Sequence, residues 1–82
     1  MTLEVLYFAN LRELLGKERE SVELPASSAT LNDLLALLAR EHRELENHLT
    51  SIRFAVNEEF RDVTATLASG DVIALIPPVS GG

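Results

Sequence analysis

Alternating hydrophobic and polar positions predict two strands in the first third of the chain. Residues 3–8 (LEVLYF) have a two-residue period with apolar side chains on both faces. That pattern favours a central strand over an edge strand, because a central strand can be covered on both sides. Residues 19–24 (RESVEL) place apolar side chains on one face and charges on the other, which predicts a half-solvated strand. Pro25 ends this second strand.

Two helices are predicted from capping residues and helical spacing. Asn10, with Glu13 three residues later, predicts a capping box at the start of a short helix that stops at Gly16. Thr30 with Asp33 predicts the start of a second helix. Its apolar face recurs at helical spacing, so the main amphipathic helix is expected over residues 31–42. The charged segment 41–46 that follows is expected to be a solvated helix end.

The second half of the chain predicts strands separated by turn residues. Asn57-Glu58 is a plausible tight turn, because Asn tolerates positive φ. Gly70-Asp71 turns the chain into an unbroken apolar run, and Pro77-Pro78 ends that run because proline cannot donate to a sheet ladder. The predicted strands are a third strand through Ile52, Phe54 and Val56, a short return strand with Phe60 and Val63, and a buried strand over residues 72–76.

The predicted order is therefore ββαβββ, an α+β fold without internal repeats. One long helix cannot cover both faces of a four- or five-stranded sheet, so part of one face should remain open to a partner. The simplest assembly wraps a mixed sheet around the helix, with the first and last strands adjacent and parallel at its centre. That is the β-grasp (ubiquitin-like) arrangement. Residues 1–76 are expected to form this domain, and residues 77–82 an extended, flexible C-terminal tail ending in Gly-Gly.

Size and charge narrow the classes of function. The chain has 82 residues, a formal net charge of −6 and no cysteine, so it holds one domain without disulfides, thiolate nucleophiles or Cys-ligated metals. An acidic chain would repel a phosphate backbone, and no apolar run is long enough to span a membrane. We therefore expect a cytoplasmic protein that binds neither nucleic acid nor membranes. Its acidity suits a basic protein partner, although solubility alone also explains it.

Catalytic groups are scarce in the sequence. His42 and His48 are six residues apart, a spacing that suits neither metal ligation by neighbouring helical turns nor a catalytic triad. The sequence also contains no Gly-rich phosphate loop and no serine in a nucleophile-elbow context. We expect no metal site, no permanently bound cofactor and no catalytic apparatus of the chain's own.

The C-terminal segment is the most unusual part of the sequence. A buried strand is followed by Pro77, Pro78, Val79, Ser80, Gly81 and Gly82, a run without any charged side chain. Proline keeps the exit extended, and two glycines allow the last peptide units to pass through a channel too narrow for a Cβ atom. The only reactive group in this run is the α-carboxylate of Gly82. That carboxylate becomes electrophilic only when activated, for instance as an acyl-adenylate made by an ATP-dependent partner. Either the absence of cysteine protects such a terminus, or it is an ordinary feature of a small domain.

These residues resemble the small, sulfur-carrying subunit of molybdopterin synthase over essentially the whole chain. The matching motifs are VLYFA and LREL near the start, AVN in the middle, and GD followed by PPVSGG at the end. The resemblance implies a ubiquitin-like β-grasp fold. It also implies that an adenylating enzyme uses ATP and Mg²⁺ to activate Gly82, and that a sulfurtransferase system converts the adenylate to a thiocarboxylate. The thiocarboxylate then donates sulfur to cyclic pyranopterin monophosphate inside the large subunit of a heterotetramer, forming the dithiolene of molybdopterin.

The resemblance also assigns individual residues. Gly82 takes the thiocarboxylate role and Gly81 the channel-passing role, while Phe60 and Ile76 match apolar positions that contact the adenylating enzyme and the large subunit. Some family members have Phe where this chain has Ile76, so the contact there loses ring area. Phe60 belongs either to the interface or to the edge of the core. Three other functions remain open: a ubiquitin-like protein modifier, a sulfur carrier for another pathway such as thiazole synthesis, or a β-grasp binding module whose tail is inert.

Overall fold

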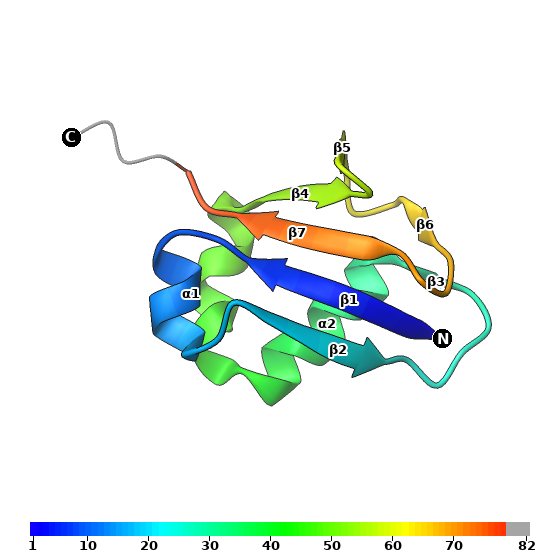
Figure 1. Cartoon of the computed structure of the whole chain (residues 1–82), viewed down its shortest axis with the longest axis horizontal. Coiled ribbons are helices and arrows are strands. Elements are labelled where there is room, and N and C mark those ends of the chain that lie inside the picture. Colours follow the sequence, from blue (N-terminus) through cyan, green and yellow to red (C-terminus); the bar gives the residue numbers. More distant parts are fainter. Residues whose placement is uncertain (79–82) are drawn as a thin grey trace.

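A mixed five-stranded sheet forms the front layer of the molecule, with the helices behind it (Figure 1). The structure is a computed structural model that describes residues 1–78. The sheet has the order β2-β1-β7-β4-β5. Its central pair, β1 and β7, is parallel and every other neighbouring pair is antiparallel. The strands of this sheet are β1 (Thr2–Tyr7), β2 (Arg19–Glu23), β4 (Arg53–Val56), β5 (Glu59–Arg61) and β7 (Val72–Ile76).

The remaining elements are three helices and a small second sheet. The helices are α1 (Asn10–Leu15), α2 (Leu31–Glu41) and the 3₁₀-helix η1 (Arg43–Ser51), and the second sheet pairs β3 (Ala29–Thr30) with β6 (Thr66–Leu67). The predicted β-grasp fold is confirmed, including the parallel pairing of the first and last strands. The two-residue strands β3 and β6 were not predicted, because a single pair of residues on each strand gives no periodic signal.

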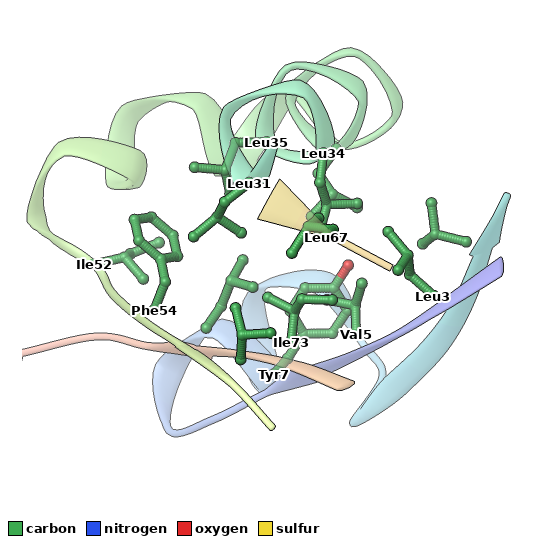
Figure 2. Close-up of a cluster of buried hydrophobic side chains, with 14 of the residues drawn as sticks. Leu3, Val5, Tyr7, Leu31, Leu34, Leu35, Ile52, Phe54, Leu67 and Ile73 are labelled. Atoms are coloured by element: carbon green, nitrogen blue, oxygen red, sulfur yellow. The ribbon is translucent and has the colours of Figure 1, made fainter. Parts of the chain in front are cut away.

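The hydrophobic core lies between the inner face of the sheet and α2 (Figure 2). Alternate residues of β1 and β7 point inward, where they meet one side of α2. The fully enclosed members that β1, β7 and α2 contribute are Leu3, Val5, Tyr7, Leu31, Leu34, Leu38, Ile73 and Leu75. The leucines recur at helical spacing and the strand residues at a period of two, as the sequence predicts.

The two predicted helix starts have different outcomes. The predicted helix start at Thr30 is confirmed: Thr30 and Asp33 form a capping box, in which each side chain bonds the backbone N–H of the other residue. The predicted capping box at Asn10 and Glu13 is wrong, because Asn10 is already the first helical residue. Ala9 occupies the N-cap at a φ of 51°, without a side-chain hydrogen bond. The helix does stop at Gly16, whose backbone adopts the left-handed conformation with a φ of 71°.

The charged segment after α2 is not simply a solvated helix end. The helix stops at Glu41, and the chain continues as η1. Glu44 and Glu46 are exposed as expected, but Leu45 between them is fully buried. Because η1 is a 3₁₀-helix with three residues per turn, it turns Leu45 into the core while its charged neighbours face solvent.

A tight hairpin joins β4 to β5 at the predicted Asn57-Glu58 turn. Both residues have positive φ, 51° and 70°, which is the geometry of a type I′ turn. The Asn57 side chain accepts a hydrogen bond from Val72 N at 3.0 Å and donates one to Asp71 Oδ1 at 2.9 Å. These bonds join the hairpin to the start of β7. The return strand ends at Arg61, earlier than predicted, so Val63 lies outside it.

Candidate functional site

Within residues 1–78, no helix covers the sheet face opposite the core (Figure 1). Side chains alternate along each strand, so residues next to the core positions point to this outer face. One row of register partners crosses four strands and consists of Leu6, Ala74, Ala55 and Phe60. We call the surface formed by this row together with Phe8 and Ile76 the outer face. Phe60 is 56% exposed and Phe8 is 38% exposed. Exposed rings on a continuous apolar face are typical of an interaction surface.

The C-terminal segment leaves the domain at one end of this outer face. Because β7 is parallel to β1, its carboxyl end lies beside the end of β1, where Phe8 N donates to Leu75 O at 3.3 Å. β7 ends at Ile76; Pro77 is buried and Pro78 is exposed. The predicted tail residues Val79, Ser80, Gly81 and Gly82 lie outside the described residues. The structure thus places the start of the C-terminal tail, Pro77 and Pro78, next to the outer face; we call these two residues the root of the tail.

Phe60 and Ile76, the two predicted partner-binding residues, share the outer face. Phe60 is paired with Ala55, and its exposure shows that it does not close the core. Ile76 is half-buried at the end of β7. Arg53 connects the two: it is the register partner of Ile76, and its guanidinium carbon lies 4.1 Å from the centroid of the Phe60 ring. Sequence analysis missed Arg53, although it shares the alternation phase of Ala55 and therefore belongs to the outer face.

A polar cluster of Tyr7, Glu20 and His42 connects the sheet to the end of α2. Tyr7 Oη donates to Glu20 Oε2, and His42 Nε2 lies 2.7 Å from the same oxygen. Lys17 Nζ lies 3.6 Å from the other carboxylate oxygen. His42 is the C-cap residue of α2, so the cluster fixes the helix end against β1 and β2.

Burial and hydrogen bonding perturb two groups of this cluster. Burial is the main cause that raises the pKa of Tyr7 far above its usual value, and the hydrogen bond to Glu20 adds to it. Burial alone would raise the pKa of Glu20, but hydrogen bonds from Tyr7 and His42 outweigh it and hold that pKa below its usual value. The cluster therefore keeps a neutral tyrosine beside an ionised carboxylate. Its members bond one another, which is the arrangement of a structural clamp.

Within residues 1–78, no group of three or more His, Asp or Glu side chains is placed to hold a metal ion. None of the helices over the same residues is sufficiently long and apolar to cross a bilayer.

A β-grasp sheet with an apolar outer face and a C-terminal exit beside it defines a ubiquitin-like protein. The model of the ThiS family matches residues 5–82. This chain belongs to the ThiS family.

Three relatives illustrate the range of similarity. The chain is 40% identical to a molybdopterin synthase sulfur carrier subunit from Chlamydomonas reinhardtii over 85 residues, covering all of both chains. The crystal structure of SAMP1 from Haloferax volcanii has a TM-score of 0.90 at 32% identity, also over both full chains. A complex of subunits 1 and 2 of the molybdopterin-converting factor from Helicobacter pylori contains a chain similar at a TM-score of 0.74 and 32% identity, again covering both chains fully.

Proposed function

We propose that this protein is the sulfur carrier subunit of molybdopterin synthase, acting in molybdenum cofactor biosynthesis. The observation that supports this most directly is the full-length similarity to relatives of that name, up to 40% identical among those compared. The fold adds a second line of support, because the last strand ends beside an apolar face suited to a partner. In this role the chain presents a reactive terminus and the partners supply the catalysis.

The proposed chemistry takes place at the carboxylate of Gly82. One carboxylate oxygen attacks the α-phosphorus of ATP on a Mg²⁺-dependent adenylating enzyme, and pyrophosphate leaves. The outer sulfur of a sulfurtransferase persulfide then attacks the acyl carbon and AMP leaves. A second thiol of the sulfurtransferase system attacks the inner sulfur of the resulting acyl disulfide, so that a disulfide forms there and the thiocarboxylate of Gly82 is released. In the large subunit, the thiocarboxylate sulfur forms a bond to a carbon of cyclic pyranopterin monophosphate and displaces an oxygen leaving group. Water then cleaves the bond between that sulfur and the acyl carbon, which leaves the sulfur on the pterin and returns the carboxylate of Gly82. Each carrier delivers one sulfur atom, so a dithiolene requires two deliveries.

Residues of this chain have positioning roles in that sequence. The outer face, with Phe60 and Ile76, holds the partner. The buried Pro77 fixes the direction in which the chain leaves the sheet, because its φ is restricted and it forms no ladder bond. Gly81 allows close passage to a catalytic centre, since it has no Cβ atom. Such partners are cytoplasmic enzymes in this proposal, and the carrier works in the same compartment.

The large subunit is the partner with structural support. The Helicobacter pylori neighbour is a complex of the two subunits of its molybdopterin-converting factor. We infer a corresponding complex for this chain, assembled as a heterotetramer with two small subunits. The adenylating enzyme and the sulfurtransferase are inferred from the chemistry that Gly82 requires.

Intact-mass spectrometry tests the proposal. The chain is co-expressed with its host's adenylating and sulfur-transfer enzymes, and a control lacks Gly82. We expect a mass gain equal to the exchange of one oxygen for sulfur, located at Gly82 and absent from the control. The sulfur-loaded protein, mixed with the large subunit, should then convert cyclic pyranopterin monophosphate to molybdopterin. Failure of that conversion with a sulfur-loaded chain would point to another acceptor pathway, such as thiazole synthesis.

A second candidate function is protein modification. It is favoured by the structural similarity to a Haloferax volcanii protein described as small archaeal modifier protein 1, with a TM-score of 0.85 over 95% of this chain. Both functions begin with adenylation of Gly82, and they differ in the nucleophile that attacks the adenylate: sulfur in a sulfur carrier, a lysine amine in a protein modifier. If Gly82 instead became linked to lysine side chains of other proteins, conjugates would appear in the same experiment and the terminus would keep no sulfur.

A further inference from the structure

Arg53 lies where a partner of the outer face would cover it. It is the register partner of Ile76, the last residue before the tail, and its guanidinium stacks on the Phe60 ring. A protein that binds the tail and also contacts Phe60 must therefore cover the Arg53 guanidinium. A cation–π contact does not use the guanidinium N–H groups as donors to an oxygen, so Arg53 can still donate them to an acceptor of a partner.

The charge of Arg53 is not neutralised by the described part of its own chain. Within residues 1–78, three of the seven Lys and Arg side chains pair with carboxylates, as Arg12 does with Glu18, Lys17 with Glu20 and Arg19 with Glu4, whereas Arg40, Arg43, Arg53 and Arg61 form no such pair. No carboxylate of these residues lies within ion-pairing distance of Arg53, although the neighbouring hairpin contains Glu58 and Glu59. Arg53 differs from the other unpaired arginines in its position, because it lies on the outer face beside Phe60 and Ile76, where a partner can use its charge.

Covering an unpaired cation carries a large cost in free energy. Removing a charged group from water is unfavourable unless hydrogen bonds and an opposite charge replace the lost hydration. A partner that buries Phe60 and Ile76 buries the space between them as well, so it must supply acceptors for Arg53. A carboxylate meets this need best, since it binds the guanidinium fork through two parallel hydrogen bonds.

We propose that Arg53 is a specificity-determining residue of the outer face, which docks an acidic side chain of the large subunit beside the root of the tail. This rests on the proposed function, because it takes the large subunit as the occupant. The complex would then combine apolar contacts at Phe60 and Ile76 with one charge-assisted pair between them. The pair excludes partners that place a cation or an apolar group opposite Arg53.

Binding of the large subunit to charge variants tests this assignment. The variants are Arg53→Glu, Arg53→Met, which keeps an unbranched side chain without the charge, and Arg40→Glu. Arg40→Glu is the matched control, since it makes the same charge change on α2, behind the sheet. Dissociation constants are measured by titration calorimetry at low and high salt, with circular dichroism to show that each variant is folded.

The expected result is a loss of affinity specific to position 53. Arg53→Glu should weaken binding at low salt by roughly tenfold or more, Arg53→Met should be intermediate, and Arg40→Glu should match the unmodified chain. Affinity of the unmodified chain should fall with salt, and that of Arg53→Glu should not. Equal affinities for Arg53→Glu and Arg40→Glu would overturn the assignment. So would an effect confined to the adenylating enzyme, or self-association of the chain through this face.

The test also separates this inference from the proposed function. If the unmodified chain binds the large subunit and transfers sulfur while Arg53→Glu does both equally well, only the Arg53 assignment fails. If the unmodified chain neither binds the large subunit nor supports molybdopterin formation, the proposed function fails and the inference with it.

Discussion

Truncation of Phe60 to alanine should separate partner binding from folding. The ring is 56% exposed and lies opposite Ala55 on the outer face, away from the core cluster. Less than half of its surface is buried within the domain, and alanine keeps part of that burial. At about 25 cal/mol per Å² of apolar area, the free energy of unfolding should fall by about 1 kcal/mol.

The expected loss in binding follows from the exposed part of the same ring. Taking roughly 200 Å² for a phenylalanine side chain, about 110 Å² remains for a partner to cover. An alanine would offer about half of that area, so the area term alone removes about 1.5 kcal/mol. This corresponds to roughly a tenfold higher Kd, and a cavity left in the interface would increase the loss. Phe60→Asp should weaken binding further, because a buried carboxylate without a partner is costly.

Calorimetric titration of the large subunit measures the binding change, and urea unfolding measures the stability change. Ala36→Asp, at an exposed position of α2, is the control for the charge that Phe60→Asp introduces. It should leave the Kd unchanged. The reasoning would be refuted if Phe60→Ala bound as tightly as the unmodified chain. It would also be refuted if this variant lost several kcal/mol of stability, because the ring would then belong to the core.

Three further outcomes are expected. Leu45→Ala should lower the free energy of unfolding by about 3 kcal/mol in urea titration, since Leu45 is fully buried; a change below 1 kcal/mol would contradict its place in the core. The lowered pKa of Glu20 means that its contribution to stability is present above the ordinary carboxyl pKa and is lost as the pH falls through the lower folded value. Glu20→Gln should therefore show a flatter decline in stability below pH about 5, and an unchanged decline would refute this. Asn57→Ala should cost about 1–2 kcal/mol by thermal unfolding, because it places alanine at positive φ and removes bonds to Asp71 and Val72; Asn57→Ser at wild-type stability would show that the side-chain bonds contribute little.

Much of the fold could be predicted because its strands and main helix have regular periods. Residues 3–8 and 72–76 are apolar on both faces, which identified the two central strands, and the leucines of α2 repeat at helical spacing. Thr30 and Asp33 gave a local capping signal that depends on a few neighbouring residues alone. Periodic and local features of this kind can be recognised from a single sequence.

Features that depend on tertiary contacts were missed. Leu45 is one apolar residue in a charged run, and no period shows that η1 turns it inward. The bonds of Glu20 to Tyr7 and His42 join residues 13 and 22 positions apart, so their proximity follows only from the fold. Ala9 took the N-cap in place of Asn10, because the chain leaving β1 reaches the helix in a positive-φ conformation.

The candidate site was predictable in part for the same reasons. The terminal Gly81-Gly82 is visible in any reading of the sequence, and the open sheet face follows from having one long helix. The position of Arg53 beside Phe60 and Ile76 could not be predicted, because it depends on the register of β4 against β7 and on the direction of a long side chain. A cation in a short strand gives no sign of its neighbours until that register is known.

In the proposed function, folding and partner binding use opposite faces of the same strands, so the register of these strands affects both. In β7, Ile73 and Leu75 point into the core, while Ala74 and Ile76 point to the outer face. Because the side-chain period is two, a shift of one residue in the β1–β7 register would exchange the two faces. The core contacts of Ile73 and Leu75 therefore also determine that Ile76 ends the strand beside Arg53 and that the chain leaves the sheet there. Substitutions on the outer face should change affinity with little effect on stability, whereas substitutions on the inner face should change both.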